Sequence, residues 1–116
     1  MDNNIEKKEI LNNINEKYKI LLRILEAEGN SEVRFAINQL KNDLSAIEDL
    51  FENGTLDTDY NDILHLIKSN YRRMYPPRGG LTEFLIWRQD FNERVSVNKP
   101  LIDVQDELAA IFKKLT

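Results

Sequence analysis

Apolar residues recur along most of the chain at steps of three and four. This spacing places side chains on one face of an α-helix. Five such runs are present, and they predict five helices. The runs are Leu11, Ile14, Tyr18, Leu21 and Leu25; Val33, Ile37, Leu40, Leu44, Ile47 and Phe51; Tyr60, Leu64, Ile67, Tyr71 and Met74; Phe84, Trp87, Phe91 and Val95; and Leu101, Val104, Leu108, Ile111 or Phe112, and Leu115.

Turn and capping residues mark where these helices should begin and end. Gly and Asn commonly end helices, proline cannot continue one, and Ser, Thr and Asp cap helix N-termini. The predicted ends are Gly29-Asn30, Asn53-Gly54 and Pro76-Pro77 for the first three helices. The predicted starts are Ile5, Ser31, Asp57 or Thr58, Thr82, and the turn that contains Pro100.

The fourth run could form either a strand or a helix. The letters "FLIWR", residues 84–88, are typical of a strand when taken alone. A helix is favoured because the spacing continues to Phe91 and Val95, and we expect Trp87 to lie in the core. The sequence therefore predicts an all-α, single-domain antiparallel helical bundle spanning residues 1–116. Its long N-terminal helical hairpin is packed by three shorter helices.

Composition narrows the class of protein without giving its chemistry. Hydrophobic residues make up 41% of the chain, charged residues 31%, and the net charge is −4. There is no cysteine, so disulfides, thiolate metal sites and cysteine nucleophiles are excluded, and a cytoplasmic location is expected. The polar N-terminus lacks the apolar stretch of a secretory signal. No apolar run approaches the roughly 20 residues of a membrane span.

Two patterns resemble a calcium site and a catalytic site, but each lacks residues that the site requires. Asp57, Asp59 and Asn61 match the first positions of a calcium loop, but Asp62 and Lys68 stand where glycine and a bidentate glutamate are required. The single histidine, His65, has no Ser or Cys nucleophile placed beside it by a known motif. We therefore expect no catalytic residue, no metal and no cofactor.

The stretch "YPPRGGLTEF", residues 75–84, interrupts the helical pattern. It follows a helix and lacks the lysine of a phosphate-binding loop, so a nucleotide site is not predicted. Gly79-Gly80 instead predicts a tight, rigid corner that uses backbone angles other residues avoid. Arg78 is expected to bond helix carbonyls or an acid of the first two helices.

Charge is distributed unevenly along the chain. Residues 68–99 hold seven basic and three acidic residues, a net +4, whereas residues 42–67 hold seven acids and no lysine or arginine. Such a chain is suited to a charged partner. The predicted partner-binding acidic face comprises Asp43, Glu48, Asp49, Glu52, Asp57, Asp59 and Asp62. A possible second surface comprises Arg72, Arg73, Arg78 and Arg88.

The corner also carries a resemblance. Gly79-Gly80-Leu81-Thr82-Glu83-Phe84 is similar to a motif of a family of small bacterial proteins of unassigned function, in which a double glycine precedes a hydroxyl residue and an acid. Thr82 and Glu83 stand where Ser and Asp are commoner. The likeness covers about a third of the chain and implies no catalytic residues. Size, acidity and helical pattern also resemble bacterial toxin-immunity proteins as a class.

These observations favour a non-enzymatic protein-binding module. The leading hypothesis is an immunity protein or inhibitor that neutralises a bacterial toxin by covering a basic surface on it. The alternative is a nucleic-acid-associated or phage-encoded regulator that uses the basic segment 68–99. The net charge of −4 weighs against that alternative, because phosphate neutralisation drives nucleic-acid binding. A homodimer is compatible with the pattern.

Overall fold

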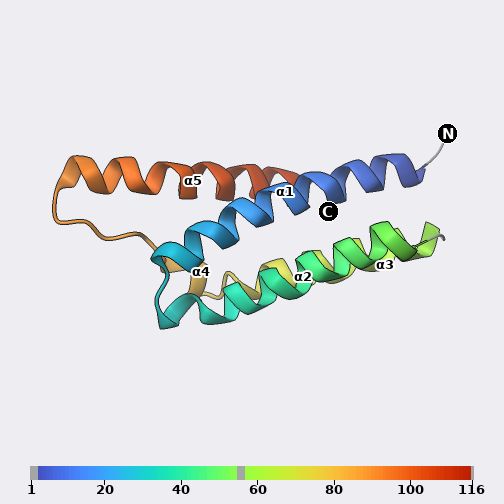
Figure 1. Ribbon diagram of the computed structural model, residues 1–116, viewed down its shortest axis with the longest axis horizontal. Coiled ribbons are helices and arrows are strands. Elements are labelled where there is room, and N and C mark those ends of the chain that lie inside the picture. Colours follow the sequence, from blue (N-terminus) through green and yellow to red (C-terminus); the bar gives the residue numbers. More distant parts are fainter. Residues whose placement is uncertain (1–2, 55–56, 116) are drawn as a thin grey trace.

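The first helix, α1 (Asn3–Glu28), lies against each of the other three long helices. In the computed structural model, which describes residues 3–54 and 57–115, these are α2 (Arg34–Asn53), α3 (Asp57–Arg73) and α5 (Phe91–Lys114). Helices α2 and α3 form an antiparallel pair beside α1, and α5 packs against α1 and, through the stacked Tyr71 and Phe112 rings, against α3 (Figure 1). No residue of the described ranges forms a strand, so the predicted all-α bundle is confirmed.

The core follows the predicted apolar faces. All five residues of the first run are fully buried, because α1 is enclosed by neighbours on several sides. Leu40 and Ile67, at the centres of the second and third runs, are fully buried as well. The apolar face predicted for the last run is also confirmed, with these residues buried on α5: Leu101, Val104, Leu108 and Phe112.

Short connections close the ends of the long helices. A single 3-10 turn, η1 (Ser31–Val33), joins α1 to α2. The predicted cap Ser31 is not the capping residue there: the Asn30 side chain accepts a hydrogen bond from the Glu32 N–H at 2.9 Å. Asn30 lies in an extended conformation that suits this capping geometry.

The corner after α3 depends on its glycines, as predicted. Gly79 and Gly80 have φ angles of 75° and 54°. A Cβ on Gly80 would also lie 3.0 Å from the Pro76 ring. The Leu81 N–H donates to the Met74 carbonyl at 3.0 Å, which closes the turn. The corner leads into the short helix α4 (Gly80–Glu83).

Two details predicted for this corner are wrong. Thr82 is not an N-cap, because it lies inside α4 and its hydroxyl donates to the Pro76 carbonyl at 2.5 Å. Arg78 is exposed and forms no hydrogen bond or ion pair within the described part of the chain. The arginine that reaches an acid of the first two helices is Arg88, which pairs with Glu28.

The predicted fourth and fifth helices are the main error. Residues 84–90 are extended, and α5 begins at Phe91 and runs through Pro100 without a break. The Asp90 side chain caps α5 by accepting from the Glu93 N–H at 2.9 Å. Pro100 removes one helical hydrogen bond, and its exposed position keeps its ring out of the core. The described residues form five helices, as predicted, but α4 is a single turn and α5 is a long helix in place of a short one.

Candidate interaction surface

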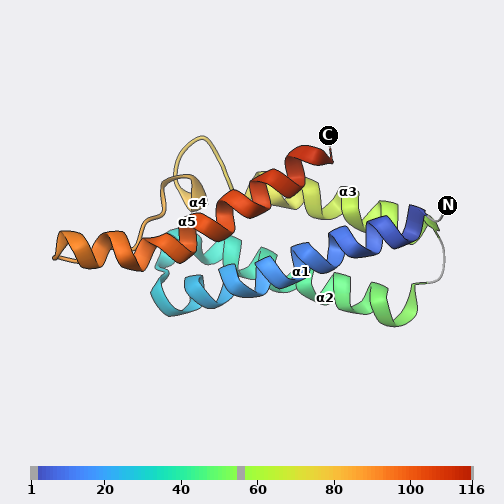
Figure 2. The same ribbon diagram turned by 90° about the horizontal axis from the view of Figure 1, so that it is seen from above.

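The extended segment 84–90 and the first turns of α5 project beyond the rest of the bundle (Figures 1 and 2). We call this projection the tip. The segment runs outward from α4, and α5 returns toward the bundle beside it. The projection contributes to an elongated molecule of 51 × 25 × 24 Å.

Side chains alternate along the extended segment, as in a strand. Phe84 and Ile86 are buried against the bundle, whereas Leu85 and Trp87 are exposed. The expectation that Trp87 lies in the core is therefore wrong, because an extended backbone turns every second side chain outward. Leu85, Trp87 and Phe91 are 65%, 70% and 66% exposed, and we call these three residues the tip patch.

A buried asparagine fixes the extended segment to α5. The Asn98 Oδ1 accepts from the Ile86 N–H, and the Asn98 Nδ2 donates to the Ile86 carbonyl, both at 2.8 Å. The same Nδ2 donates to the Arg94 carbonyl at 2.8 Å. The side-chain amide thus satisfies both backbone groups of Ile86, as a neighbouring strand would.

Two arginines stiffen the tip further. Arg88 joins the extended segment to the end of α1 through Glu28, with 2.6 Å between the Nη2 and Oε2 atoms. The Arg94 guanidinium lies 4.3 Å from the centre of the Trp87 ring and 5.6 Å from that of Phe91. This cation–π packing holds Trp87 in place while leaving its outer face accessible.

Asn98→Ala is expected to free the extended segment. The Ile86 amide should exchange its hydrogen faster, and the free energy of unfolding should fall by about 1 to 2 kcal/mol, because the opened backbone can bond to water instead. Hydrogen exchange followed by mass spectrometry checks this result. Asn92→Ala, an exposed change on the same helix, is the control. Equal exchange of the Ile86 amide in both variants would contradict the clamp.

The predicted acidic face is divided by the structure. Asp43 is buried, with 1% of its surface exposed, so it cannot meet a partner. Asp49, Asp59 and Asp62 line one groove between the end of α2 and the start of α3. Glu48 and Glu52 line another hollow, toward α1. The side chain of Asp57 lies outside the described residues.

Asp43 lies among polar groups inside the bundle. Its Oδ1 accepts from the Asn70 Nδ2 at 2.9 Å and from the Gln39 Nε2 at 3.1 Å. Burial raises the pKa of the Asp43 carboxyl to about 6, and these two hydrogen bonds oppose the rise. Asp43 Oδ2 and the Tyr18 hydroxyl have no hydrogen-bond partner within the described part of the chain. Burial, followed by the Asp43 charge, raises the pKa of Tyr18.

The basic residues proposed as a second surface lie in different surroundings. Arg72 and Arg73 are exposed in the last turn of α3, where cations complement the helix dipole. Arg78 is exposed in the corner, and Arg88 is paired with Glu28. Nucleic-acid binding by this set stays a prediction.

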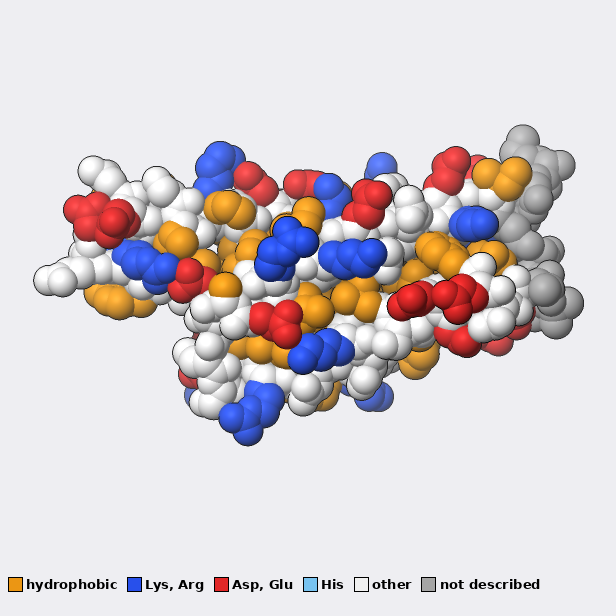
Figure 3. Space-filling model, in the orientation of Figure 1, with side chains coloured by type: hydrophobic (Ala, Val, Ile, Leu, Met, Phe, Trp, Pro, Cys, Tyr) orange, Lys and Arg blue, Asp and Glu red, His pale blue; other side chains and the backbone are white. Residues whose placement is uncertain are grey.

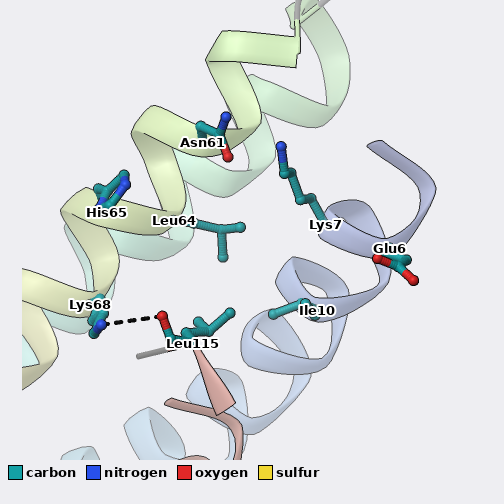
Figure 4. A pocket seen from close by; sticks show the side chains of 8 residues that line it. All are labelled: Glu6, Lys7, Ile10, Asn61, Leu64, His65, Lys68 and Leu115. Atoms are coloured by element: carbon teal, nitrogen blue, oxygen red, sulfur yellow. Dashed lines mark hydrogen bonds between the residues drawn. The ribbon is translucent and has the colours of Figure 1, made fainter. Parts of the chain in front are cut away.

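A shallow groove of about 270 Å³ lies between the start of α1, α3 and the end of α5 (Figure 4). Ile10, Leu64 and Leu115 line its apolar part. The Lys68 Nζ donates to the Leu115 carbonyl at 3.3 Å, so this cation already has a partner. His65 is exposed at the groove edge, with no hydrogen bond among the described residues to orient it as a base.

Comparisons of the chain with protein-family models, with curated proteins and with solved structures found no match. Across the described ranges, no helix combines the length and the apolar character required to cross a membrane. The same ranges hold no group of three or more His, Cys, Asp or Glu side chains arranged to bind a metal ion.

Sequence reasoning missed Asn98 and Arg94, which hold the tip together. A signal for the start of α5 was present: Asp90 and Glu93 form the spacing of a helix-capping box. The aromatic and β-branched residues of 84–88 were a second signal, because they are typical of a strand when taken alone. The pairing of Asn98 with Ile86 had no signal in the sequence, because it joins residues twelve positions apart through their folded geometry.

Proposed function

We propose that the protein is a non-enzymatic protein-binding module that holds its partner with the tip patch. The observation that carries this proposal is the exposure of Leu85, Trp87 and Phe91 together on a projecting, clamped segment. Large apolar side chains gathered on a surface mark interaction sites more often than single exposed ones do. Figure 3 shows hydrophobic side chains at the projecting end, on the left, among charged ones.

The composition of the tip supports binding by a few strong contacts. Trp and Arg are over-represented among the residues that dominate binding energies at protein interfaces. Arg94 already packs over the Trp87 ring, so less side-chain entropy remains to be lost when a partner covers it. A rigid, prepared anchor of this kind favours affinity.

Within this class, we propose an immunity protein or inhibitor of a bacterial toxin, acting in the cytoplasm. The acids at the far end of the α2–α3 pair support a basic partner, because Glu48, Asp49, Glu52 and Asp62 are all exposed there. Opposite charge across an interface speeds association and rejects wrong partners. In this proposal the tip patch supplies most of the affinity and the acidic end contributes specificity.

Trp87→Ala should weaken binding by more than about 2 kcal/mol, the loss typical of an interface anchor. The tagged full chain would capture its partner from an extract of the organism that encodes it, with the product of the neighbouring gene as first candidate. Titration calorimetry would then compare variants. Phe35→Ala, on α2 and also exposed, is the matched control and should bind as the wild type does.

A third variant separates the two surfaces. Glu48→Lys combined with Glu52→Lys removes acids from the far end without touching the tip. Its binding should show a slower association rate and a smaller loss of affinity than Trp87→Ala. A partner that tolerates Trp87→Ala and is lost with the lysine variant would contradict the assignment to the tip.

A further inference from the structure

Helix α5 carries a second apolar face that no described residue covers. Val95, Ile102 and Ala109 are spaced by seven and are all exposed. At 100° per residue, a step of seven returns a side chain to within about 20° of its starting direction. These three residues therefore form one stripe, which we call the α5 stripe. The core residues of α5, such as Leu101 and Leu108, point about 100° away from it.

One basic and one acidic residue lie beside the stripe, on either side of its centre. Lys99 and Asp106 are exposed and are themselves spaced by seven, so they share one edge of the stripe. Lys99 precedes Ile102 by three positions and Asp106 follows it by four. The two opposite charges are therefore equidistant from a point between Ile102 and Asp103.

When two copies of α5 lie antiparallel, this arrangement brings opposite charges together across the interface. Residues equally far before and after the centre of an antiparallel helix pair face each other. Lys99 of one helix then meets Asp106 of the other, on both sides of the centre. In a parallel pair this edge of the two helices would lie on opposite sides of the seam, so Lys99 and Asp106 would not meet.

We infer that the α5 stripe binds a second copy of this chain, with the two α5 helices antiparallel and Ile102 of each near the two-fold axis. Val95 of each copy packs beside the partner's Ala109. A two-fold interface uses the same patch on both subunits, which is what a self-complementary charge order provides. Lys99 also pairs with Asp103 of its own helix at 2.8 Å, but exposed pairs of this kind are weak and exchange readily.

This inference does not rest on the proposed function: Leu85 and Trp87 lie outside the α5 stripe, and only Phe91 of the tip patch lies on the same side of α5, one turn before Val95. An antiparallel pair would carry the two tips at opposite ends of the dimer. A partner with two binding sites could then engage both tips, and its apparent affinity would rise through the high local concentration of the second site.

Sedimentation of the full chain over a wide concentration range tests the inference. The wild type should shift from monomer to dimer mass as concentration rises. Ile102→Lys should remain a monomer, since it buries a charge at the axis. Leu66→Lys is the matched control, because Leu66 on α3 is 48% exposed and Ile102 is 46% exposed, and it should dimerise normally.

Exchanging the charges of Lys99 and Asp106 tests the antiparallel arrangement itself. Lys99→Asp and Asp106→Lys should each weaken the dimer about tenfold or more, and the double variant should restore it, because each new aspartate faces a new lysine. Circular dichroism would show that every variant keeps its helices. A wild type that stays monomeric, an Ile102→Lys dimer, or a double variant weaker than both single ones would overturn the inference.

Discussion

Replacing Ile67 or Leu40 by alanine is expected to lower the free energy of unfolding by about 2 to 5 kcal/mol. Both side chains are fully buried, one on α3 and one on α2. Alanine would remove apolar contacts and leave a cavity that the tightly packed neighbours cannot fill. Urea titration followed by circular dichroism measures the change. The loss is a large fraction of the stability of a chain this size, so the melting temperature should fall markedly.

Leu66→Ala is the control for this prediction. Leu66 neighbours Ile67 in sequence but is exposed, because it lies on the outer side of α3. Its replacement should change the free energy of unfolding by no more than about 0.5 kcal/mol. A loss below that value at both Leu40 and Ile67 would show that the packing of α2 and α3 differs from the one described.

Asp43→Asn is expected to stabilise the protein by about 1 to 3 kcal/mol at pH 8. The wild-type carboxyl is nearly fully buried and has a pKa of about 6, whereas its ordinary value is 3.8. Above pH 6 the folded protein must therefore hold an ionised group without a cation beside it. Each unit of pKa difference corresponds to about 1.4 kcal/mol, so the full difference approaches 3 kcal/mol. Asparagine stays neutral and avoids this cost.

The pH dependence has a definite sign. The folded state binds the Asp43 proton more tightly than the unfolded state does, so this group stabilises the fold fully below about pH 4. That contribution is lost as the pH rises through about 6. The stability of the wild type relative to Asp43→Asn should therefore fall between pH 4 and pH 7. Glu48→Gln, an exposed change on the same helix, should show no such trend.

Thermal unfolding of the three proteins at several pH values measures this difference. The comparison with Asp43→Asn is required because the two proteins share every other ionisable group. If the wild type gained stability relative to Asp43→Asn between pH 4 and pH 7, the carboxyl would have to be ionised favourably in the core. The buried polar arrangement described for Asp43 would then be wrong.

The apolar faces of the bundle could be predicted because helical packing repeats along the sequence. Leu11, Tyr18 and Leu25 share one face of α1, and their spacing alone places them in the core. The same reasoning succeeded for α3 and for the second half of α5. On α2 it placed Leu40 and Ile47 correctly, whereas Ile37, Leu44 and Phe51 are only partly buried. It works where each side chain's environment is set by its own helix.

The tip could not be predicted in this way because its structure depends on contacts between distant residues. Phe84, Trp87 and Phe91 have helical spacing, yet the Asn98 amide pairs with the Ile86 backbone and holds residues 84–90 extended. Local spacing carries no information about such a partner. The chain direction changes at Asp90, whose side chain caps α5.

The acidic face illustrates a different limit. A run of acids is usually a solvated surface, and this holds for Glu48 and Glu52. Asp43 is an exception to this rule. It lies on the inner side of α2, where Asn70 of α3 supplies a buried hydrogen-bond donor. Its position four residues before Ile47 and three after Leu40, both buried, already placed it on the apolar face of α2.

The central position of α1 also bears on how the chain is made. α1 is synthesised before α5, one of the helices that cover it. Tyr18 packs beside Phe112, with 6.3 Å between ring centroids, and Lys17 pairs with Glu107. A nascent chain that has reached only α3 therefore leaves part of α1 without its final cover. Its apolar surface is open to chaperones until α5 has emerged, and a chain truncated before α5 would lack both that cover and the tip.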